Sequence, residues 1–166
     1  PYTTLFRSEG RTLAQALREE PIGIRRALKI AVVLADALQA AHERGVIHRD
    51  VKPSNIMLDA DERVRLMDFG LAKHAVDVTD HTRSGTMIGT PSYMSPEQAR
   101  GDSKHVDVRT DVYSLGAVIY EMLTGTPPFA GESVLEIVLK VINEEPVAPR
   151  RRRPSIHADV QTNAMK

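Results

Sequence analysis

The sequence predicts a mainly α-helical domain that carries one small β-hairpin. Two long stretches place apolar residues at spacings of three and four, the period of a helix that buries one face. Between them, two short β-prone runs flank a polar turn, which is typical of a hairpin. The length of 166 residues, with 42% hydrophobic and 27% charged residues, fits one globular domain.

Composition excludes several function classes. The 22 basic and 22 acidic residues cancel, so no overall field would attract nucleic acid or an anionic membrane. The chain has no cysteine, which excludes disulfides, Cys-ligated zinc and thiol nucleophiles. No stretch reaches the roughly 18 uncharged apolar residues of a membrane span, and no signal peptide is visible. We therefore expect a cytoplasmic location, with which a membrane anchor elsewhere in the parent protein is compatible.

The first long helix is predicted to begin with Pro21 at the first helical position and to stop at Gly45. Its length would be about 23 residues, on the order of 35 Å. Its apolar residues cover a wide stripe, which predicts a helix central to the core. They are Ile24, Ala27, Leu28, Ala31, Val33, Leu34, Ala35, Leu38 and Ala41.

The hairpin is predicted to have strands at residues 56–58 and 64–67 around a turn at 59–62. Asn55 and Asp68 would then emerge at the same open end of the two-stranded ribbon. The register that follows from a four-residue turn pairs Leu58 with Arg63 and Asn55 with Leu66.

Residues 70–91 are rich in Thr, Ser, Asp and Gly and lack a helical or strand period. Loops of this length usually have a functional reason in compact domains, so we expect a regulatory or binding element. Ser95 and Gln98 then form the pattern of a capping box with Pro96 at the first helical position, which predicts a short helix.

The second long helix is predicted from the apolar residues between 112 and 123, with Thr110 or Asp111 as its N-cap and Gly125 as its end. A further helix is predicted from a second capping box, Ser133 with Glu136, to Asn143. The run of four arginines at 150–153 is interpreted as a solvated basic segment, with nucleic-acid binding as the alternative.

Three short motifs carry the chemistry. Residues 48–55 read HRDVKPSN, residues 68–70 read DFG, and residues 95–97 read SPE. In this order they resemble the catalytic loop, the magnesium-binding loop and the end of the activation segment of protein kinases. Residues 40–58, 93–101 and 111–129 are most similar to the bacterial (Hanks-type) serine/threonine protein kinases.

The resemblance implies a protein-kinase-like fold, of which this chain would be the C-terminal helical lobe with its small hairpin. The β-rich N-terminal lobe would be missing, since the sequence has no glycine-rich loop, no strand lysine and no helix glutamate to pair with it. We expect residues 9–166 to be a partial kinase domain, truncated at both ends. Residues 1–8, PYTTLFRS, resemble a translated sequencing adapter and are expected to be a non-native leader.

The resemblance implies an ATP-dependent enzyme that transfers the γ-phosphoryl group of ATP to serine or threonine hydroxyls of proteins. Asp50 would orient the acceptor hydroxyl and take its proton, and Lys52 would place positive charge at the transferring phosphate. Lysine at position 52 is typical of the serine/threonine branch. Thr90 matches the threonine that bridges these two residues. Asp111 resembles a buried aspartate that holds the catalytic loop by its backbone amides.

Two cofactors are implied, ATP and Mg²⁺. Magnesium prefers oxygen ligands and keeps several waters, so one amide and one carboxylate suffice, and Asn55 and Asp68 supply them. Met57 would lie under the adenine and Thr12 near the ribose. The cofactor-binding set is Lys52, Asn55, Met57 and Asp68.

Regulation would act through Arg49, which the family pairs with a phosphorylated residue of the activation loop. The best-placed acceptors are Thr82, Ser84 and Thr86. The implied partners are a protein substrate and a second copy of the kinase for phosphorylation in trans. The family's arginine partner for Glu97 does not occur in the sequence, so we expect an unpaired carboxylate there.

Two alternatives to an enzyme stay open. A non-catalytic binding or scaffold module with a kinase-like lobe predicts the loss of catalytic residues, yet Asp50, Lys52, Asn55 and Asp68 are all present. A nucleic-acid binder that uses residues 150–153 predicts a steep salt dependence of binding. Without the nucleotide clamp of the other lobe, the 166-residue chain by itself is expected to have little or no activity.

Overall fold

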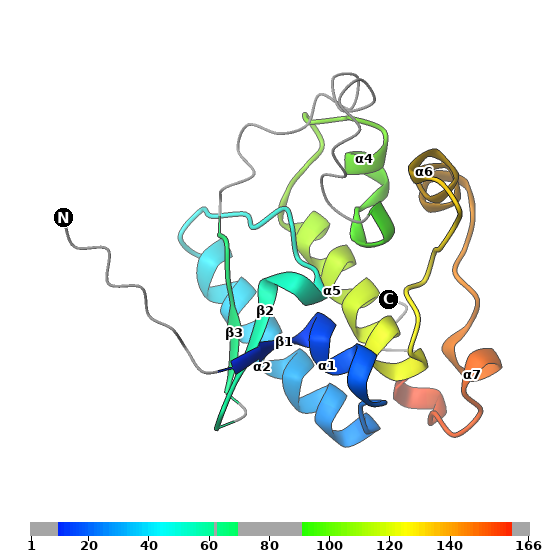
Figure 1. Ribbon diagram of the computed structural model, residues 1–166. Helices are drawn as coiled ribbons and strands as arrows, with labels where there is room; N and C mark the ends of the chain where they lie inside the picture. Colours follow the sequence, from blue (N-terminus) through cyan, green and yellow to red (C-terminus); the bar gives the residue numbers. More distant parts are fainter. Residues whose placement is uncertain (1–9, 62, 70–90, 161–166) are drawn as a thin grey trace.

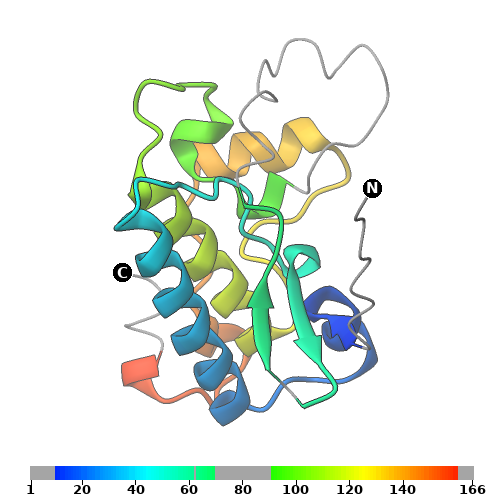
Figure 2. The same cartoon turned by 90° about the vertical axis from the view of Figure 1, so that its left-hand side faces the viewer.

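The computed structural model describes residues 10–61, 63–69 and 91–160. Two long helices, α2 and α5, lie side by side at the centre (Figure 1), and a small sheet covers one side of α2 (Figure 2). The prediction of a mainly helical domain with a hairpin is confirmed. The helices are α1 (Leu13–Glu19), α2 (Ile24–His42), α4 (Pro96–Ala99), α5 (Val108–Thr124), α6 (Val134–Asn143) and α7 (Pro149–Arg152), with 3-10 turns η1 (Pro53–Asn55) and η3 (Pro91–Tyr93).

The sheet has three antiparallel strands in the order β1 (Gly10–Thr12), β2 (Ile56–Asp59) and β3 (Val64–Leu66). Strand β1 was not predicted, and the predicted hairpin register is wrong by one residue, because Leu58 pairs with Val64. The reason is Asp59, whose Oδ1 accepts the backbone N–H groups of Asp61 and Arg63 at 3.0 and 2.8 Å. Its own N–H donates to the carbonyl of Arg63 at 3.0 Å, so the turn closes one pair earlier.

Helix α2 begins at Ile24 after an N-cap at Gly23, so the prediction that Pro21 starts it is wrong. A separate helix, α1, precedes it and was not predicted. A capping box starts α1, in which Thr12 Oγ1 accepts the N–H of Gln15 and Gln15 Oε1 accepts the N–H of Thr12. The capping box therefore opens a separate helix before α2, in a stretch of sequence that shows no clear apolar period.

The buried face of α2 is narrower than predicted. Leu28 and Val33, which the pattern placed in the core, are 39% and 43% exposed, on the flanks of the helix. The face that meets α5 and the sheet consists of Ala27, Ile30, Ala31, Leu34 and Leu38.

The N-cap of α5 lies three residues before Thr110 and four before Asp111, the two predicted caps. Asp107 is its N-cap and accepts the N–H of Arg109 at 2.8 Å. Thr110 and Asp111 are inside the helix, and both side chains are buried. The predicted end is confirmed, because Gly125 adopts a left-handed φ of 82° and its N–H donates to the carbonyl of Glu121.

The two capping boxes that the sequence predicted differ in outcome. Ser95 and Gln98 form a complete box at α4. At α6, Ser133 Oγ accepts the N–H of Glu136 at 3.1 Å, but the Glu136 carboxylate accepts the N–H of Glu132. The second box is therefore only half formed, although the predicted bounds of α6 are confirmed.

One hydrophobic core joins α1, α2, β2 and α5, and Ile156 closes it from the far end of the chain. The arginine run is exposed at residues 150–152, as the prediction of a solvated segment requires, but it is not an irregular linker. Its first residues belong to α7, and Arg153 donates to the carbonyls of Leu123 and Ile22 at 3.1 and 3.4 Å. Within the described ranges, no helix is long and apolar enough to cross a bilayer.

Candidate active site

The loop at residues 48–55, called the 48–55 loop below, follows α2 and is anchored by Asp111 of α5. The Asp111 carboxylate is fully buried and accepts the backbone N–H groups of His48 and Arg49 at 2.8 and 2.7 Å. His42, the last residue of α2, brings its Nε2 to the same carboxylate at 2.7 Å. Arg49 has a φ of 68°, a conformation that costs energy for a side chain with a Cβ. The two charge-assisted backbone bonds offset that strain.

His48 joins the 48–55 loop to the end of the hairpin. Its ring is fully buried, and Nε2 lies 2.8 Å from the carbonyl of Met67. A carbonyl only accepts, so Nε2 carries the proton, and Nδ1 is left to accept the N–H of Asp50 at 3.3 Å. The ring also meets Phe69 edge-on, with 4.7 Å between centroids. His48 is therefore a packing and positioning residue.

Three of the predicted catalytic side chains converge. Asp50 Oδ2 accepts from Lys52 Nζ at 2.7 Å and from Asn55 Nδ2 at 2.9 Å. The Asn55 amide nitrogen also donates to the Asp50 carbonyl at 2.9 Å. Both side-chain contacts use Oδ2, and the Asp50 side chain remains 40% exposed, so a substrate group can reach it from solvent.

Asn55 and Asp68 emerge at the same end of the hairpin, as predicted. The N–H of Met67 donates to the carbonyl of Asn55 at 2.8 Å, which places Asp68 one residue beyond that pair. Because Asn55 uses its amide nitrogen toward Asp50, its amide oxygen is on the opposite side of the planar group. Asp68 is exposed and has a φ of 62°. The amide oxygen of Asn55 and the exposed carboxylate of Asp68 are therefore both at this end of the hairpin.

Met57 and Thr12 are direct partners in the β1–β2 register. Both are partly exposed. The sequence placed these two residues near one ligand, and the sheet does bring them side by side. Thr82, Ser84, Thr86 and Thr90, also predicted as site residues, lie outside the described part of the chain.

Comparison with known proteins identifies the family of the chain. A family model described as "Protein kinase domain" matches residues 5–164. The chain belongs to the protein kinase domain family.

Curated relatives of this kinase domain include several bacterial proteins. "Serine/threonine-protein kinase PknB" of Mycobacterium leprae is 43% identical over 167 residues, which covers 100% of this chain and 26% of the relative. The protein of the same name from Mycolicibacterium smegmatis is 46% identical over 162 residues, 96% of this chain and 25% of the relative. "Probable serine/threonine-protein kinase CE0033" of Corynebacterium efficiens is 46% identical over 151 residues, 90% of this chain and 23% of the relative. The chain thus spans about a quarter of the length of these relatives.

Glu97 of the kinase domain is not left unpaired, which corrects the prediction. It is only partly buried, and Thr110 Oγ1 donates to its carboxylate at 2.6 Å. Burial raises the pKa of Glu97, but the hydrogen bonds from Thr110, its own backbone N–H and Ser95 outweigh this, and the pKa is lowered overall. A neighbouring hydroxyl supplies the partner that the prediction sought in a distant arginine.

One contact to the 48–55 loop and one contact to its anchor Asp111 were missed in the sequence. Gln98 Nε2 donates to the carbonyl of Arg49 at 2.7 Å, and His42 binds Asp111. Gln98 was assigned only a capping role, and His42 was not singled out as a site residue. Their partners lie 49 and 69 positions away, and no local pattern reports a contact at that separation.

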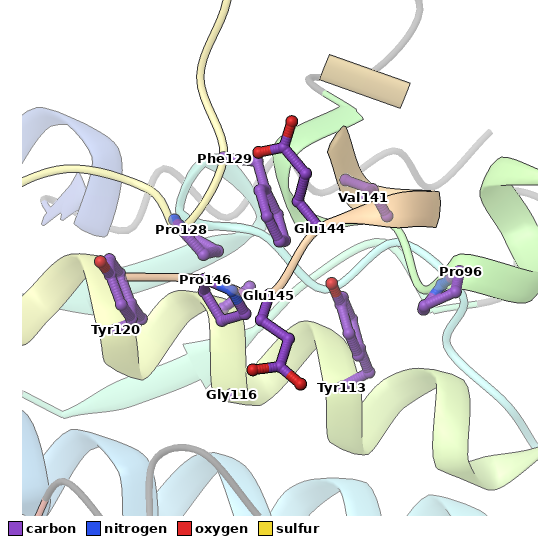
Figure 3. A pocket seen from close by; sticks show the side chains of 11 residues that line it. Pro96, Tyr113, Gly116, Tyr120, Pro128, Phe129, Val141, Glu144, Glu145 and Pro146 are labelled. Atoms are coloured by element: carbon purple, nitrogen blue, oxygen red, sulfur yellow. The ribbon is translucent and has the colours of Figure 1, made fainter. Parts of the chain in front are cut away.

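A groove of about 400 Å³ lies apart from these residues, between α5, α6 and residues 144–146. Figure 3 shows Tyr113, Tyr120, Phe129 and Pro146 around it. Its lining is mostly apolar and includes none of Asp50, Lys52, Asn55 or Asp68. The groove is therefore separate from the candidate active site.

Proposed function

We propose that this chain is the C-terminal lobe of a serine/threonine protein kinase, an enzyme that transfers the γ-phosphoryl group of ATP to serine or threonine hydroxyls of proteins. The observation that carries the proposal is the convergence of Lys52 Nζ and Asn55 Nδ2 on Asp50 Oδ2, in a loop fixed by Asp111. A loop held this firmly suits phosphoryl transfer, because catalysis there is mostly positioning and electrostatics.

The residues at the end of the hairpin fit a magnesium ion. Mg²⁺ takes oxygen ligands and keeps several waters, and the Asn55 amide oxygen with the Asp68 carboxylate is such a donor set. Among the described residues, no cluster of three or more His, Asp or Glu side chains offers a richer site. When bound with ATP, the ion neutralises phosphate charge. Asn55 and Asp68 would hold it, and Lys52 would contact the nucleotide.

Asp50 and Lys52 would perform the transfer step. Asp50 is exposed enough to meet an acceptor hydroxyl, which it would orient and whose proton it would accept. Lys52 lies 2.7 Å from the same carboxylate, so its charge would be next to the transferring group. Met57 and Thr12, paired across β1 and β2, would bind the adenine and ribose.

Several further assignments belong to this proposal. Thr90 would bridge Asp50 and Lys52, and Arg49 would pair with a phosphoryl group on Thr82, Ser84 or Thr86. The substrate would be a protein with a Ser or Thr acceptor, and a second copy of the kinase would phosphorylate this one in trans. The reaction would take place in the cytoplasm. The sequence has no glycine-rich loop, so the remaining nucleotide contacts would come from a separate N-terminal lobe.

The test is phosphate transfer from radiolabelled ATP to a serine- and threonine-containing protein, with a kinase that joins this lobe to an ATP-binding lobe. Asp50→Asn keeps the shape of the side chain but removes the base, and should lower kcat by about 10²–10⁴-fold. Asp61→Asn, at an exposed carboxylate of the hairpin turn, is the matched control and should leave kcat unchanged.

Equal kcat for Asp50→Asn and the unmodified kinase would contradict the role of Asp50. Binding of Mg²⁺–ATP without any transfer would instead favour the scaffold alternative. The 166-residue chain alone should transfer little phosphate, and turnover by it that Asp50→Asn abolishes would contradict that expectation.

A further inference from the structure

The strained backbone of Arg49 is held at both its N–H and its carbonyl group. Its N–H donates to Asp111 Oδ1 at 2.7 Å, from α5. Its carbonyl accepts from Gln98 Nε2 at 2.7 Å, from α4. Asp50 is the next residue, so the orientation of the Arg49 peptide sets where the Asp50 side chain begins. Two short bonds thus hold the backbone of this left-handed residue between the two helices, directly before Asp50.

Gln98 itself has little freedom. It is 8% exposed, and its Oε1 accepts the N–H of Ser95 at 3.1 Å in the capping box of α4. With the oxygen used by the cap, the amide nitrogen must face the carbonyl of Arg49. One planar amide therefore connects the start of α4 to the 48–55 loop, and neither end can move without breaking a buried hydrogen bond.

The two helices that hold Arg49 are also joined to each other. Ser95 Oγ lies 3.4 Å from Thr110 Oγ1, and Thr110 Oγ1 donates to Glu97 at 2.6 Å. Thr110 directly precedes Asp111 in α5. The contacts form a closed circuit from Arg49 through Gln98, Ser95 and Thr110 to Asp111, so a displacement of α4 changes the hold on Arg49.

We propose that Gln98 is a positioning residue for phosphoryl transfer. It keeps Arg49 in its left-handed conformation and so aims Asp50, and it couples the placement of α4, the helix that follows residues 70–90, to the 48–55 loop. This inference rests on the proposed function for its kinetic consequence, but the coupling itself is a property of the folded chain. In the proposed active site, Gln98 contacts neither substrate nor cofactor.

Replacement of the Gln98 amide group by a carboxylate tests the coupling. Gln98→Glu keeps an oxygen for the Ser95 cap but replaces the donor that faces the Arg49 carbonyl with a second acceptor. The matched control is Gln15→Glu, the equivalent capping-box position of α1, where the side chain is exposed. Both variants change a glutamine to a carboxylate at the third residue of a capped helix, and only one faces the 48–55 loop.

The measurement is NMR on the labelled 166-residue chain. In Gln98→Glu, the amide protons of His48 and Arg49 should exchange at least about tenfold faster, because the Arg49 carbonyl loses its donor and the loop then keeps its bonds to Asp111 less firmly. The carbonyl ¹³C resonance of Arg49 should shift. The amides of Ala99 and Arg100 should stay protected because the cap of α4 remains. Gln15→Glu should leave all four amides unchanged.

The pH dependence of amide exchange in Gln98→Glu distinguishes the loss of this one hydrogen bond from a general loss of structure. As pH falls through the ionisation of the introduced carboxyl, it regains a proton to donate to the Arg49 carbonyl. The exchange of His48 and Arg49, taken relative to the same amides of the unmodified chain at each pH, should then return toward that of the unmodified chain. If the variant does not fold, the unmodified chain still gives an answer: the Nε2 protons of Gln98 should exchange much more slowly than those of exposed Gln15. Equal exchange at the two side chains would overturn the proposal.

The kinetic arm uses the kinase that joins both lobes. Gln98→Glu should lower kcat at least about tenfold and leave the KM for ATP nearly unchanged, because the nucleotide-binding residues are not altered. Faster amide exchange without phosphate transfer by the unmodified kinase would mean that the proposed function fails and the coupling stands. Transfer by both proteins at the same rate, with unchanged amides, would mean that the coupling fails and the function stands.

Discussion

Two backbone N–H groups and one histidine ring meet at the buried carboxylate of Asp111. Asp111→Ala would leave the N–H groups of His48 and Arg49 without an acceptor and release the strain of Arg49. We expect the free energy of unfolding to fall by about 3–5 kcal/mol, measured by urea denaturation followed by circular dichroism. Asp36→Ala, on an exposed face of α2, should change it by less than about 0.5 kcal/mol. A loss below 1 kcal/mol at Asp111 would show that the loop has other anchors.

Single residues of the candidate site were largely predictable, and their anchors were only partly so. Asp50, Lys52, Asn55 and Asp68 stand in short motifs whose spacing fixes their identity, and the structure brings the first three into contact. Asp111 was identified only through the family resemblance. Gln98 was recognisable as a cap, but its second hydrogen bond depends on where α4 packs.

At the scale of the element, helix ends defined by one residue were predictable. Gly125 and the Ser95 cap need only local backbone geometry, and both are confirmed. The start of α5 was not, since Asp107 accepts the N–H of Arg109, whereas the side chains of the expected caps bind Glu97 and Arg49 instead. The start of α2 was missed because the capping box of Thr12 and Gln15, which opens the separate helix α1, was not recognised.

The end of α5 makes an element-scale prediction. An added Cβ at Gly125 would meet no atom within 4 Å, so only its φ of 82° opposes a side chain there. Gly125→Ala should therefore lower the free energy of unfolding by about 1 kcal/mol. Gly23, the N-cap of α2, has an ordinary φ of −64° and equally open space, and Gly23→Ser should raise stability by a few tenths of a kcal/mol. Thermal denaturation of both variants would check the signs, and equal effects would contradict the conformational argument.

At the scale of the whole molecule, a partly buried carboxyl makes stability depend on pH. Burial raises the pKa of Glu121 above 4.5, although the hydroxyl of Tyr93, which donates to it at 2.5 Å, lowers it again in part. The folded state therefore holds this proton more tightly than the unfolded state. The corresponding stability is fully present below pH 4.5 and is lost as pH rises through the raised pKa.

Glu121→Gln removes this dependence. The free energy of unfolding of the variant, minus that of the unmodified chain, should rise with pH above 4.5 and then level off. The measurement is a series of urea denaturations from acidic to neutral pH. Glu136→Gln should give the opposite sign, since a hydrogen bond from Lys140 lowers the pKa of Glu136, and its stabilisation is lost as pH falls. A difference independent of pH for Glu121→Gln would contradict the assignment.

The overall architecture followed from the sequence because two amphipathic helices and a hairpin leave few ways to bury their apolar faces. The extent of burial did not. Leu28 and Val33 share the apolar period of α2, but a helix packed on one side by α5 and on another by a narrow sheet buries only part of its circumference. Period alone reports which residues can be buried, and the number of neighbouring elements decides which are.

The hydrogen bonds of Asp111 also order events during protein synthesis. Asp111 lies 62 residues after Arg49, and it is made by the ribosome only after the whole 48–55 loop and hairpin. At about 5–20 residues per second, this is a delay of roughly 3–12 s. During that interval nothing from α5 holds Arg49 in its left-handed conformation. The nascent loop thus lacks this anchor for a period and takes its folded shape only when α5 arrives.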